Sequence, residues 1–317
     1  MEVIAISNHK GGCGKTTTAI NLAYALSLQK KKVLLIDIDP QAHATLGLNI
    51  NPEQITKSIF DVLKPQSKTN LSSAILPLYK NLDILPGAMN TAYLEQLLAG
   101  QKRREYKLKD ILQKNTNYDI VIIDTAPSLG LLTINALLAA NKILIPLEPS
   151  SFALHGLQKL EETLDLLKKT TGHTPAVRYL LTMYSPQSKF SLDFLQTVRP
   201  FFDLLLLQTK ITWSEHYKNA TAACVPAKEF NPEAIEALEY DNAAREVIGW
   251  IQGKAPVFIS ALPRTVKPIV GYHKKQNEAV ELSFGRDEQH EYKYVFDLNG
   301  NVHTIKSKHL EMPVLFN

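Results

Sequence analysis

Cysteine is scarce in this sequence, which has only two in 317 residues. Cys13 and Cys224 lie far apart, and their spacing matches neither a disulfide framework nor a zinc site. Long hydrophobic runs are also missing, since none approaches the ~18 residues that a membrane-spanning helix needs. We therefore expect a protein of the reducing cytoplasm that has no membrane association.

An excess of charge of one sign is missing as well, because 35 Lys and Arg residues face 31 Asp and Glu residues. A net charge of +4 is too small to mark a nucleic-acid binder, so any DNA-binding surface has to be a local patch. Met1 and Glu2 lead directly into a strand pattern, and we expect no signal peptide. The length and a hydrophobic content of 45% suffice for one large α/β domain, alone or with an appendage.

A glycine-rich stretch lies between an apolar run over residues 3–6 and a helical pattern over residues 17–28. It reads Lys10-Gly11-Gly12-Cys13-Gly14-Lys15-Thr16-Thr17. Strand, glycine-rich loop and helix in this order predict a phosphate-binding loop, because glycines let successive N–H groups point at one anion. The helix adds the positive end of its dipole. Lys15 would supply charge to the β- and γ-phosphates, and the Thr16 hydroxyl would ligate Mg²⁺.

The loop departs from the common G-x-x-x-x-G-K-[ST] pattern, because His9 stands where the first glycine would be and a second lysine, Lys10, opens the loop. The run K-G-G-x-G-K-T-T resembles the deviant Walker-type loop of the ParA/MinD superfamily of ATPases. This resemblance implies that the loop residues bind ATP with Mg²⁺. It also implies that Lys10 reaches across an ATP-dependent homodimer to the partner subunit's nucleotide. We interpret Cys13, in the variable slot, as a tolerated small side chain, with a redox role as the alternative.

Two continuous apolar runs end in aspartates, as is typical of buried parallel strands whose carboxyl ends carry ligand-binding residues. Residues 33–36 lead into Asp37-Ile38-Asp39-Pro40-Gln41, which is similar to the family's D-x-D-P-Q motif. The resemblance implies that Asp39 positions the attacking water beside the metal-bound triphosphate, and Asp39 is also a candidate Mg²⁺ ligand together with Thr16 and Asp124. Residues 118–123 lead into Asp124 and are similar to the family's Walker B segment, which implies that Asp124 holds Mg²⁺ through water. Residues 127–130 resemble the family's second switch, which would sense the γ-phosphate. The alternative for Asp37 to Gln41 is an ordinary turn.

Strands and helices alternate up to about residue 252, which predicts a doubly wound, mostly parallel α/β sheet. We expect one long helix over residues 90–114 and a strand over residues 204–207. From residue 253 to 317 prolines interrupt the chain, and Asn299-Gly300 between two β-rich segments predicts a hairpin with a two-residue turn. This part is expected to be a small β-containing accessory extension. It either packs back onto the ATPase domain or contacts a partner or the other subunit.

Three biological functions remain open for an ATP-dependent switch of this kind. The leading one is a ParA-like partition ATPase that binds non-specific DNA as the ATP dimer and responds to a ParB-like adaptor protein. The family's arginines are missing here, so the DNA contacts would fall to the nearby cations Lys189, Arg199, Lys210, Lys218 and Lys228. A MinD-like membrane switch needs a terminal amphipathic helix, for which residues 311–317 are too short. A metabolic or reductase member is the third alternative, although its iron-protein branch needs further cysteines.

Overall fold

The computed structural model describes residues 1–114, 117–150, 153–202 and 205–253, together with five strands of the C-terminal extension. The chain divides into two compact units. The first contains residues 1–148, 152–184 and 207–256, and the second contains residues 149–151, 185–206 and 257–317. The predicted boundary after residue 252 stays a prediction.

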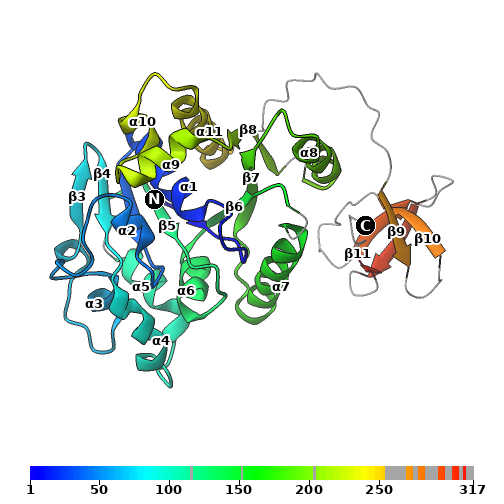
Figure 1. Ribbon diagram of the computed structural model, residues 1–317. Coiled ribbons are helices and arrows are strands. Elements are labelled where there is room, and N and C mark those ends of the chain that lie inside the picture. The colour runs from blue at the N-terminus through cyan, green and yellow to red at the C-terminus, as the bar shows by residue number, and fades with distance from the viewer. Residues whose placement is uncertain are drawn as a thin grey trace. The chain divides into compact units, whose positions relative to one another are not determined.

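An eight-stranded sheet forms the centre of the first unit, in the order β3-β4-β2-β5-β1-β6-β7-β8 (Figure 1). Strands β4 to β7 in this order are parallel, and β3 pairs antiparallel with β4. Every residue of β2 and β5 is buried, as their continuous apolar runs predicted. The eight strands are β1 (Glu2–Ile6), β2 (Val33–Asp37), β3 (Leu76–Tyr79), β4 (Leu82–Leu85), β5 (Ile120–Asp124), β6 (Lys142–Leu147), β7 (Ala176–Tyr184) and β8 (Leu206–Thr212).

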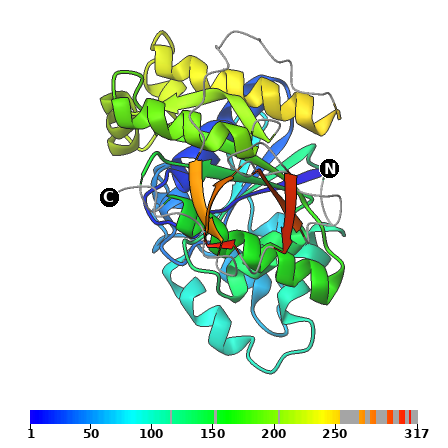
Figure 2. The same ribbon diagram turned by 90° about the vertical axis from the view of Figure 1, so that its right-hand side faces the viewer.

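Helices cover both faces of this sheet, which confirms the predicted doubly wound α/β class (Figures 1 and 2). Helices α1 and α11 pack together on one face, and α5 and α6 pack together on the other. The α-helices of this unit are α1 (Lys15–Leu28), α2 (His43–Leu46), α3 (Ile59–Leu63), α4 (Leu94–Leu97), α5 (Lys107–Leu112), α6 (Leu131–Ala139), α7 (Ala153–Thr171), α9 (Glu215–Ala222), α10 (Ala227–Phe230) and α11 (Ile235–Ile251). Short 3₁₀ turns are η1 (Leu71–Ser73), η2 (Met89–Tyr93) and η3 (Arg104–Tyr106).

The single long helix predicted over residues 90–114 is wrong. The structure has η2, α4, η3 and α5 in its place, because the backbone turns left-handed at Gly100 (φ 75°) and Arg103 (φ 55°), where an α-helix cannot continue. The Asn135 side chain of α6 stabilises this segment by two hydrogen bonds to its backbone. Its amide oxygen accepts from the Leu108 N–H at 3.2 Å, and its amide nitrogen donates to the Arg104 carbonyl at 3.0 Å. Tertiary hydrogen bonds therefore override the local helical pattern.

The strand predicted over residues 204–207 lies further along the chain, at β8. This strand is at the edge of the sheet, and carboxylates of α11 accept hydrogen bonds from its backbone. Glu246 accepts from the N–H groups of residues 208 and 209, both at 2.7 Å, and Glu239 accepts from the Thr212 N–H at 2.9 Å. These bonds let polar residues form a strand that a search for apolar runs overlooks.

The second unit contains α8 (Lys189–Phe202) and the strands of the extension. β9 (Ile269–His273) lies between β10 (Glu278–Leu282) and β13 (Leu310–Glu311), and β11 (Tyr292–Phe296) pairs antiparallel with β12 (Val302–Lys306). The β-containing extension is thus confirmed. Within the strands Phe296 pairs with Val302, and the turn predicted at residues 299 and 300 lies outside the described residues.

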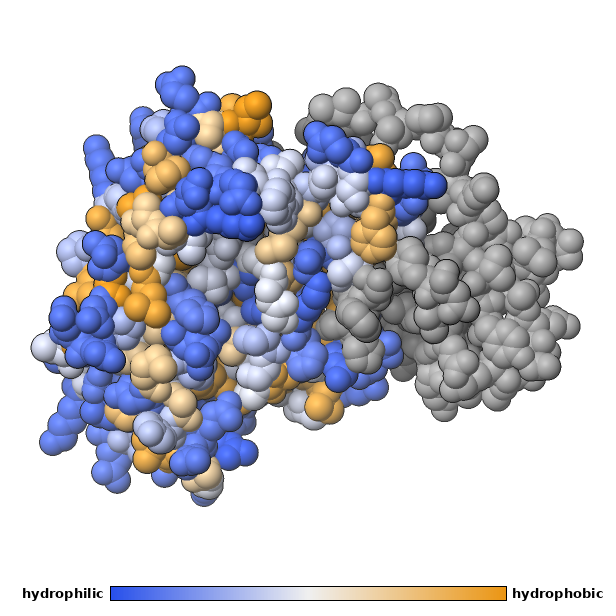
Figure 3. Space-filling model, viewed as in Figure 1, coloured by the Kyte–Doolittle hydropathy of each residue, from blue (hydrophilic) through white to orange (hydrophobic). Residues whose placement is uncertain are grey.

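The face of the molecule drawn in Figure 3 is mostly hydrophilic, with hydrophobic residues scattered in small patches. Within the described ranges, no helix combines the length and the apolar character that crossing a lipid bilayer requires.

Candidate nucleotide-binding site

The glycine-rich loop connects the carboxyl end of β1 to the first residue of α1, as the sequence predicted. Gly12 (φ 76°) and Gly14 (φ 84°) both adopt the left-handed conformation that glycine tolerates best, and Gly14 caps the N-terminus of α1. A Cβ atom added to Gly11 or Gly12 would meet no atom within 4 Å. The loop therefore leaves open space beside its backbone, where a phosphate group fits.

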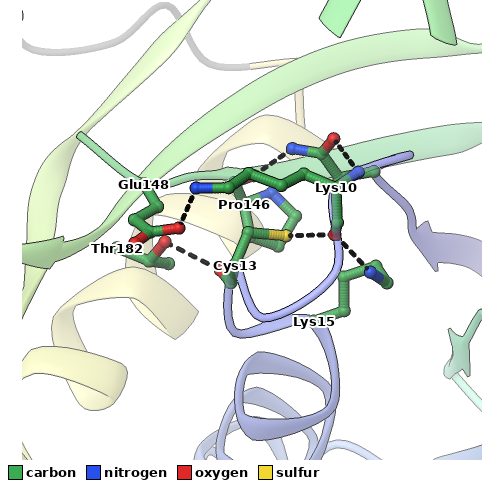
Figure 4. Close-up of polar contacts among 7 residues, drawn as sticks. Lys10, Cys13, Lys15, Pro146, Glu148 and Thr182 are labelled. Atoms are coloured by element: carbon green, nitrogen blue, oxygen red, sulfur yellow. Dashed lines mark hydrogen bonds and ion pairs between the residues drawn. The ribbon is translucent and has the colours of Figure 1, made fainter. Parts of the chain in front are cut away.

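Neighbouring strand ends hold the loop in place (Figure 4). The amide nitrogen of Asn8 donates to the Pro146 carbonyl on β6 at 2.7 Å, and its amide oxygen accepts from the Lys10 N–H at 3.0 Å. The Thr182 hydroxyl on β7 donates to the Cys13 carbonyl at 2.9 Å. These bonds fix the loop before any ligand binds, so little conformational entropy is left to lose on binding.

The two lysines of the loop have different surroundings. The Lys15 side chain is buried, with the residue 7% exposed, and its ammonium donates to the Lys10 carbonyl at 2.8 Å. The Lys10 ammonium forms an ion pair with the carboxylate of Glu148, which directly follows β6 (Figure 4). The Cys13 thiol donates to the same Lys10 carbonyl at 3.3 Å. Burial raises the pKa of this thiol, which disfavours the thiolate and supports the structural interpretation of Cys13.

The aspartates at the ends of β2 and β5 lie side by side, since Asp37 pairs with Asp124 in the sheet register. Asp37 has a structural role that the sequence did not indicate. One of its oxygens accepts from the Thr45 N–H at 2.8 Å and from the Thr45 hydroxyl at 2.7 Å, and this hydroxyl accepts from the Gly87 N–H at 2.8 Å. Burial raises the pKa of Asp37 to about 6, although the two Thr45 bonds lower it. Asp37 therefore anchors α2 and the segment after β4.

Asp39 and Asp124 fit the roles suggested by the motifs. Asp39 is buried, and its Oδ1 accepts from the Gln41 N–H at 2.9 Å, which orients the carboxylate. Asp124 is fully buried, and among the residues that the structure describes neither of its carboxylate oxygens has a hydrogen-bond partner. Burial raises its pKa well above the ordinary value, and the charge of Asp37 adds to this, whereas the Thr16 hydroxyl and Lys15 act in the opposite direction. A buried carboxylate without partners, beside a hydroxyl, suits a hydrated Mg²⁺ ion.

We expect Asp124→Asn to raise the thermal stability of the nucleotide-free protein at pH 7.5. The pKa of Asp124 is higher in the folded than in the unfolded protein. Its stabilising contribution is therefore complete below the unfolded-state pKa and is lost as the pH rises through the folded-state pKa. Near neutral pH the carboxyl group thus lowers the free energy of unfolding. Removing an unpaired buried charge should gain about 1–3 kcal/mol, or roughly 2 °C or more in Tm.

Circular dichroism at pH 7.5 and pH 5.5 measures this effect, which should shrink at the lower pH. Asp110→Asn is the matched control, because this exposed carboxylate pairs with Arg103 at the surface and its loss should leave Tm nearly unchanged. A lower Tm for Asp124→Asn at pH 7.5 would contradict the assignment of an unpaired charge.

The predicted switch segment, residues 127–130, is held by two helices. The Thr133 hydroxyl of α6 donates to the Ser128 carbonyl at 2.7 Å. The Glu95 carboxylate of α4 lies so close to Gly130 that a Cβ atom there would be 2.3 Å from its Oε1. A larger residue at position 130 would therefore have to displace the Glu95 carboxylate, and the segment lies between the end of β5 and the start of α6.

The five cations predicted to contact DNA are divided between the two units, and their contact with DNA stays a prediction. Lys189 and Arg199 lie on α8 in the second unit, whereas Lys210, Lys218 and Lys228 lie on β8, α9 and α10 in the first. Lys218 is 60% exposed, pairs with Glu215 and lies 4.7 Å from the centroid of the Trp213 ring. Lys228 forms an ion pair with the buried carboxylate of Asp241, which already balances its charge.

Sequence reasoning missed Glu148, Thr182 and Thr45. Glu148 could have been found, because it follows a buried strand as Asp39 and Asp124 do, and the carboxyl ends of parallel strands share one edge of the sheet. Thr182 and Thr45 carry no such signal, since their hydrogen bonds depend on tertiary contacts with Cys13 and Asp37.

Known proteins resemble this chain over most of its length. A family model described as an AAA domain matches residues 1–176. The sporulation initiation inhibitor protein Soj of Bacillus subtilis is 35% identical over 248 residues, which is 78% of this chain and 98% of Soj. The chromosome partitioning protein ParA of Myxococcus xanthus is 40% identical over 206 residues, 63% of this chain and 71% of that protein.

A solved structure shares the fold. It is cobyrinic acid a,c-diamide synthase from Mycobacterium smegmatis with a bound ATP analog and magnesium. Its sequence identity is 30% and its TM-score 0.70, over 81% of this chain and 99% of the synthase chain. The phosphate-binding loop, the aspartates at the ends of β2 and β5, and these similarities lead to one conclusion: the chain belongs to the ParA/MinD superfamily of P-loop ATPases.

Proposed function

We propose that this ATPase is a dimerisation switch in DNA partition, which binds non-specific DNA as its ATP-bound homodimer and is reset by slow ATP hydrolysis. One observation carries the proposal: the loop holds two lysines whose side chains differ in access. Lys15 is buried at the start of α1, where it would serve its own nucleotide, whereas the Lys10 side chain is 21% exposed and points to Glu148 at the end of β6. The family resemblance assigns this partly exposed lysine to the nucleotide of a second subunit.

The residues at the site divide the chemistry among them. Backbone N–H groups of residues 11–17, with Lys15, neutralise the triphosphate, and Thr16 and Asp124 would hold Mg²⁺. A bound Mg²⁺ offsets charge on the β- and γ-phosphate oxygens. Asp39, oriented by the Gln41 N–H, positions the attacking water. Catalysis of this kind rests on positioning and charge stabilisation. The family resemblance implies that turnover is slow and serves as a reset.

The relatives support partition as the output. Soj, matched over 98% of its own length, and the ParA protein of M. xanthus both have residue identities of 35% or more. The name of the second is chromosome partitioning protein. By analogy we propose a ParB-like adaptor protein as the partner that stimulates hydrolysis. The diamide synthase structure supports a nucleotide and magnesium as ligands of this fold, and a metabolic role is the alternative that the DNA experiment tests.

DNA binding should depend on both nucleotide and salt. Fluorescence anisotropy with random-sequence DNA should give at least about tenfold tighter binding with ATP or a non-hydrolysable analogue than with ADP, because a dimer doubles the phosphate contacts. From 50 to 200 mM salt, affinity should fall about a hundredfold for four phosphate contacts.

A pair of variants locates the contact. Lys218→Ala should weaken binding, because the Lys218 side chain is 60% exposed and its ion pair with Glu215 is open to solvent. Lys228→Ala should change it less, because the Lys228 side chain is 27% exposed and pairs with the buried carboxylate of Asp241. Binding that ignores both nucleotide and salt would contradict a role in partition through DNA and would favour the metabolic alternative.

A further inference from the structure

The Lys10–Glu148 ion pair joins the phosphate-binding loop to the end of β6. The Lys10 and Glu148 side chains are 21% and 26% exposed, so about three quarters of each is removed from water. Strands β1 and β6 are neighbours in the sheet, which brings the loop after one beside the residue after the other. An ion pair that is partly shielded from solvent is stronger than one on an open surface.

The backbone of Lys10 is held independently of this ion pair. Its N–H donates to Asn8, which is itself bonded to Pro146, and its carbonyl accepts from Lys15 at 2.8 Å and from Cys13 at 3.3 Å. The loop therefore fixes where the Lys10 side chain starts, and the Glu148 carboxylate determines where its ammonium points (Figure 4). Reaching a second subunit requires the side chain to leave Glu148.

We propose that Glu148 is a positioning residue that holds the Lys10 ammonium within its own subunit until an ATP-bound partner supplies a stronger anion. This inference rests on the proposed ATP-dependent dimer. Dimer formation breaks the pair once in each subunit, and the partner's triphosphate replaces the carboxylate because it carries more negative charge. Glu148 thereby disfavours dimers that lack nucleotide and sets the protein concentration at which ATP dimers form.

The test compares Glu148→Gln with Glu2→Gln in sedimentation velocity with Mg²⁺ and a non-hydrolysable ATP analogue. Glu2 is a matched control, because its carboxylate is also 26% exposed and pairs with Lys142, but it lies at the opposite end of β1. Loss of the Glu148 charge should favour dimerisation about fivefold for each subunit, and therefore lower the dimer dissociation constant about 25-fold. Glu2→Gln should leave that constant unchanged. Equal constants for Glu148→Gln and wild type, or equal effects of the two variants, would overturn the proposal.

Acylation of lysines, read by mass spectrometry on the nucleotide-free monomer, tests the contact separately from dimerisation. Glu148→Gln should increase the labelling rate of Lys10 about fivefold relative to Lys64, and Glu2→Gln should not. If the wild type stays monomeric with every nucleotide, the proposed function fails. The labelling then still shows whether Glu148 holds the Lys10 ammonium. Unchanged Lys10 labelling in Glu148→Gln would overturn the positioning role even if the wild type dimerises.

Discussion

Lys15→Ala is expected to abolish ATP binding, with an affinity loss of at least about a hundredfold. The Lys15 ammonium is buried at the first residue of α1 and beside the loop backbone, so its charge acts on the phosphates with little screening by water. Two charge-assisted hydrogen bonds to phosphate oxygens contribute about 3 kcal/mol or more, which corresponds to this ratio.

Isothermal titration calorimetry with ATP and Mg²⁺ measures the loss. Lys64→Ala is the control, because this lysine pairs with Asp61 on α3 and lies outside the loop. The control should bind ATP as the wild type does. Equal affinities for Lys15→Ala and wild type would show that the loop is not the nucleotide site.

Asp39→Ala is expected to slow ATP hydrolysis about a hundredfold or more while ATP binding persists. The carboxylate is proposed to orient water and not to hold the nucleotide, so its loss should trap the ATP-bound dimer. Asp39→Asn separates charge from loop structure, because its amide oxygen can still accept from the Gln41 N–H. Both variants should be equally slow in a phosphate-release assay. If Asp39→Asn hydrolyses ATP as fast as the wild type, the slow hydrolysis of Asp39→Ala results from a changed loop structure and not from the lost charge.

Local patterns were sufficient to predict the loop and the central strands. The loop could be predicted because the positive φ angles at positions 12 and 14 favour glycine. Strands β2 and β5 could be predicted because strands buried on both faces are apolar throughout. Since parallel strands end at the same edge, the sequence also predicted that Asp39 and Asp124 share a site with the loop.

Elements that depend on tertiary contacts could not be predicted from local sequence patterns. The break near Arg103 needs a non-glycine residue in the left-handed region, held by hydrogen bonds from Asn135. β8 needs the carboxylates of Glu239 and Glu246 on a helix about 30 residues away. The role of Asp37 depends on Thr45. The domain boundary after residue 252 and the role of the extension remain predictions.

Sedimentation velocity of Asp39→Ala and Lys10→Ala with ATP and with ADP tests the central claim most directly. The claim is that Lys10 acts on the nucleotide of the other subunit, whereas Asp39 acts only in hydrolysis. Asp39→Ala should sediment as a dimer with ATP and as a monomer with ADP. Lys10→Ala should bind ATP and remain a monomer with both nucleotides. A dimeric Lys10→Ala protein, or a monomeric Asp39→Ala protein, in the presence of ATP would contradict the account.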